Sequence, residues 1–400
     1  MIHSFGKPLT KLRIIILLML LPVIVKSIIL PGMGFSVLMV VAFAGEVLVL
    51  ISFNKVVLSY PAFFVLVNSL VMLLSNRLLK IETNTQDYLN LMAKFLSITL
   101  LFSVMKTISV SWSDIKNFSK FMVWLSVVAC VFNIIANRSS FNSSLFQMSA
   151  YQISFRSFFL NRNQFGMFLV VSLFFVELFF EKNNWLKYGI ITLILANLFL
   201  TLSRGSMISA LLFLFLDYAF YRRLNPQKII VPSIFIGIAL LWLFQQDGFS
   251  AFFQNSVIRS EQGNTGRFSI WGHGFNVLTK TNFLNGCGFY SGVDLAHNAG
   301  MGVDQFHSLY IDSLVDGGIL YLIIVLGLYF DVYKQCRKKI LDKRILSAYR
   351  AFAIAVLVMA SNESVSFFSV GWVDTLFTIS CFSFPLLLSN IDWKSQMTKI

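Results

Sequence analysis

The chain has little charge. Only 12% of its 400 residues are Asp, Glu, Lys or Arg, whereas a soluble domain carries about 25%. Hydrophobic residues make up 57%, phenylalanine alone accounts for 43 positions, and the mean hydropathy is +0.75. So few charged side chains exclude a water-facing surface of ordinary composition. We therefore predict an integral membrane protein that crosses the bilayer many times.

Cysteine and the usual cofactor motifs are also scarce. The four cysteines, at positions 130, 287, 336 and 381, have no framework spacing, so no structural disulfide is expected. There is no Walker lysine loop, dinucleotide fingerprint, Ser-His-Asp signature or Asp-x-Asp pair, which argues against an ATP-driven pump and a soluble-type sugar-nucleotide transferase. His297 and His307 lack a standard ligand spacing and a supporting Cys or carboxylate cluster. We therefore expect no cofactor and no metal.

Long apolar runs are what the chain has instead. A bilayer core needs roughly 20 apolar residues in a helix, which predicts an all-α polytopic fold with about 12 transmembrane helices. We treat residues 1–400 as a single membrane domain, and read the basic N-terminus and first run as an uncleaved span because 21–30 offers no small-residue cleavage site. The predicted spans are 12–30, 33–53, 56–74, 91–112, 119–136, 165–180, 185–202, 206–221, 228–245, 308–332, 346–362 and 368–389.

The basic residues set the expected orientation. The net charge of +14 raises the question of nucleic acid, but with both termini in the cytoplasm 20 of the 32 lysines and arginines fall on the inner side. The basic runs at 221–224 and 336–339 carry most of this count. Topology thus accounts for the positive charge, and no nucleic-acid partner is expected. The loops 137–164, 203–205 and 246–307 then all emerge on the outer face, where Arg162, Arg204, Arg267 and His307 can converge.

The segment 246–307, between the ninth and tenth spans, is the largest polar loop. A loop of about sixty residues is rarely a bare connection. Within it Phe268, Trp271, Phe275 and Leu278 recur at helical spacing, which predicts a short amphipathic helix lying along the membrane surface. Arg267 begins this helix, where a cation is unfavourable unless an anion is shared with the helix terminus. His273, on the outer part of the helix, is interpreted as structural.

Two further basic motifs border predicted spans. Arg204, in Thr-Leu-Ser-Arg-Gly-Ser at 201–206, is either a snorkelling arginine at a turn or a phosphate ligand, because guanidinium matches phosphate oxygens. The cluster Asn-Arg-Asn-Gln-Phe-Gly at 161–166 is either a helix cap or a group of sugar or phosphate contacts that includes Arg162 and Asn163.

His307 is the better of two candidate bases. It precedes Ser308, Leu309 and Tyr310 at the edge of an apolar span, where a lipid-linked substrate presents its polar head. His297, flanked by small residues, is read as mobile loop. The run Asp-Gly-Gly at 316–318 predicts a kink or a close-packing site inside the tenth span.

Taken in order, these motifs resemble the O-antigen ligase and O-antigen polymerase superfamily of bacterial membrane glycosyltransferases. The resemblance covers residues 161–330 and rests on an ordered set of short motifs. They are Asn-Arg-Asn-Gln-Phe-Gly at 161–166, Leu-Ser-Arg-Gly at 202–205, Gly266-Arg267 followed by Trp271, Gly-Cys-Gly at 286–288, His-Ser-Leu-Tyr at 307–310 and Asp-Gly-Gly at 316–318. The chain departs from the family at Arg162, Ser308 and Asp316, where proline, asparagine and glutamate are common.

The resemblance implies a fold and a chemistry. It implies about a dozen spans in the bacterial inner membrane with a large periplasmic loop that carries the active site. The substrate would be a glycan on undecaprenyl diphosphate, with Arg204 and Arg267 holding the diphosphate and His307 helping the acceptor hydroxyl to attack. Arg162, Asn163, Gly286, Gly288 and Tyr310 are candidate substrate contacts. Membrane lipid, a chain-length regulator and a flippase are the other expected partners.

Three functions stay open at this point. We favour a polymerase, which joins lipid-linked repeat units, over a ligase, which transfers the glycan to the lipid A core. A lipid-linked oligosaccharide flippase or other transporter is the alternative from another class, and Glu46, Asp312, Glu363 and Asp374 in or near spans are the residues that favour it. A flippase needs polar residues inside its spans, whereas here the polar candidates cluster in outer loops.

Overall fold

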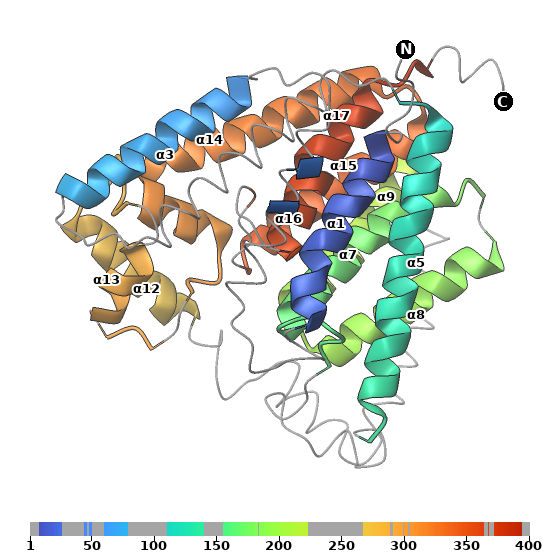
Figure 1. Cartoon of the computed structure of the whole chain (residues 1–400), viewed down its shortest axis with the longest axis horizontal. Helices are drawn as coiled ribbons and strands as arrows, with labels where there is room; N and C mark the ends of the chain where they lie inside the picture. Colours follow the sequence, from blue (N-terminus) through green and yellow to red (C-terminus); the bar gives the residue numbers. More distant parts are fainter. Residues whose placement is uncertain are drawn as a thin grey trace. The chain divides into compact units, whose positions relative to one another are not determined.

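The structure is a computed structural model, and every regular element in its described part is helical (Figure 1). It describes residues 8–25, 44–45, 48–49, 60–78, 110–139, 155–182, 184–222, 267–288, 291–298, 300–302, 305–363, 367 and 372–393. The chain divides into two compact units, each assembled from separate segments. Unit 1 comprises Met1–Phe118, Arg267–Leu341 and Ala360–Ile400, and unit 2 comprises Ser119–Gly266 and Asp342–Met359.

Unit 2 is built around α7 (Arg162–Phe179). This helix packs against α8 (Trp185–Thr201) and α9 (Arg204–Arg222), and its residues from Phe165 to Leu178 are buried on every side. A helix that is apolar all round is stable only when other helices or lipid surround it. Helix α15 (Lys343–Ala360) adds Phe352, whose ring stacks on Phe174 with the centroids 4.4 Å apart. Helix α5 (Trp112–Ala136) starts in unit 1 and continues into unit 2.

Buried polar groups tie the helices of unit 2 together. The Lys187 ammonium lies 2.6 Å from the Glu177 carboxylate, and both side chains are less than a tenth exposed. Arg344 donates to the backbone oxygens of Glu177 and Phe180, which are carbonyls at the end of α7 that have no partner within the helix. Each of these contacts satisfies a group that would be costly to bury alone.

A second polar tie holds the segment that leads into α7. The Asn133 amide donates to Asn197 Oδ1 at 2.9 Å, and both residues are fully buried. Asn133 Oδ1 in turn accepts from the backbone N–H of Ser157, which has a positive φ of 53°. The Ser157 hydroxyl donates to the backbone oxygen of Ala129. These bonds attach the segment before Arg162 to α5 and α8.

Unit 1 is built around α14 (Leu309–Lys339), which has 31 residues. Figure 1 shows α3 (Tyr60–Leu78) running alongside α14, and α12 (Arg267–Lys280) and α13 (Ser291–Asn298) beside its N-terminal part. At the C-terminal end, η5 (Ile379–Ser383) and α17 (Phe384–Ser389) also pack on α14. Helix α16 (Trp372–Thr378) precedes them and packs against α1 (Pro8–Ile24). Helix α14 ends with Arg337, Lys338 and Lys339, where cations are favourable for the helix dipole.

Helix α14 is broken at Gly318, as the Asp-Gly-Gly run predicts. Gly318 has φ 67° and ψ −172°, a region that only glycine adopts readily. The break removes the helical bonds from Ile319 and Leu320 back to Val315 and Asp316. The backbone N–H groups of Ile319 and Leu320 donate instead to the oxygens of Phe283 and Leu284, while Val315 and Asp316 accept from Cys287 and Gly288. The four backbone groups of these two lost helical bonds are thus satisfied by residues 283–288, as membrane interiors require.

The helices agree with nine of the predicted spans in position, with shifted ends. Three of them are long and apolar enough to cross a membrane, namely Trp112–Ala136, Arg162–Phe179 and Leu309–Lys339, among the residues that the structure describes. Trp185–Thr201 and Val373–Ser389 are shorter apolar helices. The predicted spans 33–53, 91–112 and 228–245 lie outside the described residues except for a few positions. The total of about 12 therefore stays a prediction, as does the single membrane domain.

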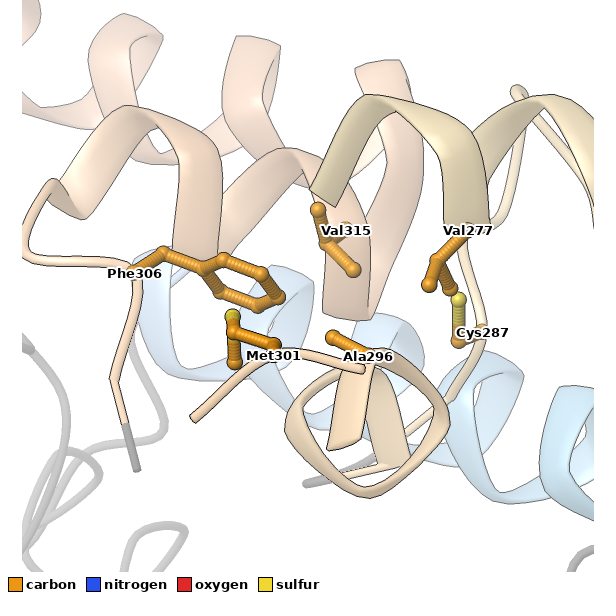
Figure 2. Packing of buried hydrophobic residues seen from close by; sticks show 6 residues of the cluster. All are labelled: Val277, Cys287, Ala296, Met301, Phe306 and Val315. Carbon is orange, nitrogen blue, oxygen red and sulfur yellow. The ribbon is translucent and has the colours of Figure 1, made fainter. Parts of the chain in front are cut away.

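The described part of the large loop contains two helices, α12 and α13, and only the first of them was predicted. The amphipathic helix is confirmed as α12, but it packs through Ile270, Gly274, Val277 and Leu278. Of the predicted apolar stripe, Leu278 is buried whereas Phe268 and Phe275 are exposed, and the position of this stripe along the membrane surface stays a prediction. The interpretation of His297 as mobile loop is wrong, because it lies in α13, whose Ala296 packs in a buried cluster. Figure 2 shows this cluster, which comprises Val277, Cys287, Ala296, Met301, Phe306 and Val315.

Candidate functional site

Arg267 is the first residue of α12, and two residues that follow α15 hold it. Its Nη1 donates to Asn362 Oδ1 at 2.8 Å, and its Nη2 lies 3.8 Å from Glu363 Oε1. The Arg267 side chain is 17% exposed, whereas the Glu363 side chain is 4% exposed. The guanidinium is therefore largely removed from water at a helix N-terminus, where the dipole disfavours a cation. A buried carboxylate offsets part of this cost.

His307 lies in the same unit, on the turn that enters α14. Its φ of 54° is unusual for a residue with a side chain, so the turn holds it in a restricted conformation. Two bonds fix its neighbours: the Trp271 indole N–H donates to the Phe306 oxygen at 2.9 Å, and the Leu309 N–H donates to the Glu363 oxygen. Burial lowers the pKa of His307, and the positive charge of Arg267 lowers it further. The imidazole is therefore predominantly neutral at pH 7 and has a lone pair available to accept a proton.

The glycines of the Gly-Cys-Gly motif shape the backbone. Gly286 and Gly288 have φ of 71° and 104°, and a Cβ on Gly286 would stand 2.5 Å from the Gly318 nitrogen. Their motif and the Asp-Gly-Gly motif therefore interlock at the break in α14. The Asp316 carboxylate also accepts from the Gly292 N–H at the start of α13, at 3.2 Å. This arrangement accounts for both motifs structurally and leaves a substrate contact at Gly286 and Gly288 as a prediction.

Two other residues of this unit bear on the chemistry. Tyr310 is the second residue of α14 and is half-buried, and its role as a substrate contact stays a prediction. Cys287, between the two glycines, is fully buried, and burial raises the pKa of its thiol to about 11. A thiol that stays protonated at neutral pH is a poor nucleophile. Cys287 therefore acts as a packing residue.

The other two arginine motifs meet each other in unit 2. Arg204 opens α9 two residues after Leu202, which ends α8 in the left-handed conformation with φ 52°. Asn161 caps α7, accepting the Gln164 N–H at 2.9 Å, which confirms the cap interpretation for that residue. A Cβ on Gly166 would stand 2.7 Å from Ser206 Oγ, so the first turn of α7 packs tightly on the first turn of α9. Arg162, Asn163 and Arg204 are all half-buried there.

The structure thus gathers the predicted residues into two groups. Arg267 and His307 are coupled in unit 1, and Arg162, Asn163 and Arg204 lie on adjoining helix starts in unit 2. Convergence of the two groups stays a prediction. Sequence reasoning missed Asn362 as a partner of Arg267 and noted Glu363 only as an acidic residue near a span. The available signal was an adjacent polar pair at the expected outer end of the predicted span 346–362.

Comparison with known proteins gives one family match. A family model described as O-Antigen ligase matches residues 189–326, a range that includes Arg204, Arg267 and His307. Arg162, Asn163, Asn362 and Glu363 lie outside it. A search of curated proteins found no match. The match supports a glycosyltransferase-like role in polysaccharide assembly. Residues 189–326, about a third of the chain, are therefore similar to the O-antigen ligase family.

Proposed function

We propose that this protein is a surface-polysaccharide polymerase of the bacterial inner membrane. It joins oligosaccharide repeat units carried on undecaprenyl diphosphate at the periplasmic face, and undecaprenyl diphosphate is the leaving group. The observation that carries the proposal is the coupling of Arg267, held by Asn362 and Glu363, to His307 in one unit. The match of residues 189–326 to the O-antigen ligase family supports the same class of chemistry.

The arginines suit the donor side of this reaction. As the bond from the anomeric carbon to the diphosphate breaks, negative charge develops on the diphosphate. A guanidinium presents several N–H donors in a planar fork that matches phosphate oxygens, and it does so best in a site with little water. Arg267 meets the second condition with its 17% exposure. Arg204, at the start of α9, would add a second cation if the two groups converge. The energy for the glycosyl transfer comes from the glycosyl-diphosphate bond of the donor.

His307 suits the acceptor side. The acceptor hydroxyl must lose its proton as its oxygen attacks the anomeric carbon, and a neutral imidazole can accept that proton. Burial and Arg267 both lower the pKa of His307, which keeps the imidazole in the neutral form that this role needs. The acceptor proton is then held on His307 as imidazolium and is released to water to restore the neutral base, and the electron pair of the broken bond leaves with the diphosphate.

A ligase is the second candidate, favoured by the description of the family that matches. It would use the same donor chemistry and transfer the glycan to the lipid A core. The transporter alternative has less support from the acidic residues on which it rests. Asp312 and Asp374 lie in the first turns of α14 and α16, where carboxylates stabilise a helix, and Glu363 pairs with Arg267. Glu46 lies outside the described residues.

A clean deletion in the native host tests the proposal. Surface glycan would be separated on a gel beside the pool of lipid-linked glycan. We expect the deletion strain to carry a lipid A core with a single repeat unit, because units are still exported and ligated but not lengthened. Bare core with long polymer retained on the lipid carrier would show a ligase instead. Loss of all glycan from the periplasmic face, with repeat units retained inside, would favour the transporter.

A further inference from the structure

We propose that Asn362 and Glu363 control how Arg267 meets an anion: Asn362 orients the guanidinium, and Glu363 is a resident counter-ion that the diphosphate of the substrate replaces. The inference rests on the proposed function, because it specifies how one residue of that site is prepared. Both residues lie beyond the matched range 189–326 and follow α15, 95 residues from Arg267. They act through Arg267 and are positioning residues.

The case for Asn362 is geometric. Its Oδ1 accepts from Arg267 Nη1 at 2.8 Å, and its Nδ2 donates to Ser361 Oγ at 2.8 Å. The second bond fixes which side of the amide faces the arginine, so the acceptor and not the donor points at the guanidinium. A long side chain loses rotational freedom when it is held in this way, and an oriented donor binds a planar anion with less further ordering. Asn362 carries no charge, so its contribution is orientation.

The case for Glu363 is electrostatic. Its carboxylate oxygen lies 3.8 Å from Arg267 Nη2, beyond hydrogen-bond distance, and its side chain is 4% exposed. At this distance the carboxylate compensates the charge of the buried guanidinium without occupying its donors at close range. The same negative charge must repel an incoming diphosphate. Glu363 is therefore expected to stabilise the unliganded protein and to weaken anion binding.

Residue 363 also connects the arginine to the histidine. While its side chain faces Arg267, its backbone oxygen accepts from the Leu309 N–H, two residues after His307. The short segment 361–363 thus contacts the start of α12 through side chains and the start of α14 through the backbone. A displacement of this segment on anion binding would therefore move both Arg267 and His307. The segment 361–363 is the shared support of these two predicted site residues.

Inorganic pyrophosphate is the probe for this inference. Its affinity would be measured by titration calorimetry on the full chain in lipid nanodiscs, with melting temperatures recorded alongside. Asn362→Ala should weaken pyrophosphate binding about tenfold, the scale of one hydrogen bond to a charged group. Glu363→Gln should instead tighten it, by about threefold, while lowering the melting temperature without pyrophosphate. Opposite effects from adjacent residues are not expected if the segment only supports the fold.

Matched variants separate the possible outcomes. Asn276→Ala on the exposed face of α12 and Asp294→Asn on α13 should leave pyrophosphate affinity unchanged. In an Arg267→Ala background, Asn362→Ala should have no further effect on pyrophosphate binding. Glu363→Gln in the same background should restore part of the lost melting temperature, because it removes the buried negative charge that Arg267 compensates. Weaker binding in both Asn362→Ala and Glu363→Gln, or normal binding in both, would overturn the inference. Normal pyrophosphate binding by Arg267→Ala alone would overturn the diphosphate role itself, and with it the proposed function of this residue.

Discussion

At the scale of single residues, the two arginines and the histidine of the proposed site differ in what surrounds them. Arg267 has a buried carboxylate and an amide as partners, and His307 is held in a left-handed turn. Arg204 begins a helix whose first turn packs on α7. These surroundings allow separate predictions for the charge of Arg267 and for the protonation of His307.

Arg204→Ala, Arg267→Ala and His307→Ala should each abolish polymer formation while the protein still inserts in the membrane. Loss of a preorganised donor to developing charge typically costs about 10²–10³ in rate. Arg267→Lys keeps the charge but loses the fork of donors, and should reduce polymer by roughly tenfold or more. Glycan length on gels, with membrane levels measured by immunoblot, checks this. Normal chain lengths in all three alanine variants would disprove the site assignment.

The titration of His307 can be predicted with its sign. Burial and the charge of Arg267 both disfavour the imidazolium, so the pKa of His307 in the folded protein lies below its ordinary value of 6.5. Activity that needs the neutral imidazole is then retained at pH 7 and is lost only as the pH falls through that lowered pKa. Arg267→Gln removes one of the two causes and should raise the pKa. Imidazole NMR with the other three histidines replaced would measure both values, and an unshifted pKa in Arg267→Gln would contradict the coupling.

At the scale of elements, the break in α14 is the feature that organises unit 1. The kink releases four backbone groups, and residues 283–288 satisfy all four. Two glycine motifs far apart in the sequence are therefore one structural unit. The buried cluster of Figure 2 lies beside the break in α14. It includes Val315 and Cys287, one from each of the two segments that the backbone bonds join.

Gly318→Ala should destabilise the protein, because φ 67° with ψ −172° is accessible in practice only to glycine and a Cβ there would collide with the backbone of Leu284. The expected cost is at least about 1–3 kcal/mol from backbone strain alone. Gly327 is a control in the same helix, since a Cβ there meets nothing within 4 Å. Gly327→Ala should be neutral or stabilising by up to about 1 kcal/mol. Thermal unfolding in detergent compares the two, and equal melting temperatures would argue against the interlock.

At the scale of the whole molecule, the prediction concerns orientation. The basic runs at 221–224 and 336–339 should face the cytoplasm with both termini, and the loop 246–307 should face the periplasm. Single cysteines introduced at Asp294 and at Lys338, in a chain without its four native cysteines, would be labelled with a membrane-impermeant maleimide. We expect labelling of intact cells at Asp294 only. Labelling at Lys338 as well as at Asp294 would place both positions on the outer face. The number of spans between them would then be even, whereas we predict one span.

Several elements could be predicted from the sequence because their signals are local. The helix from Arg267, the kink at the Asp-Gly-Gly run and the cap at Asn161 each follow from a few neighbouring residues. The inward face of α12 has no such local signal, because the predicted apolar stripe assigns only a membrane-surface face, and Phe268 and Phe275 of that stripe are exposed. In the structure Gly274 faces α14, since a Cβ there would already touch Ile311 and Phe306. Only the neighbouring helix decides that the smallest residue, and not the largest, belongs in the contact.

By itself, the sequence determined that this is a helical membrane protein and that Arg204, Arg267 and His307 are the residues to test, because composition, charge and short motifs act locally. The tertiary structure decided which of these residues share a unit and what holds them. The contact of Arg267 with Asn362 joins residues 95 positions apart, and the bonds of residues 283–288 to the kinked α14 join residues 28 or 36 positions apart. Such contacts depend on how helices pack in three dimensions, and no local pattern encodes them.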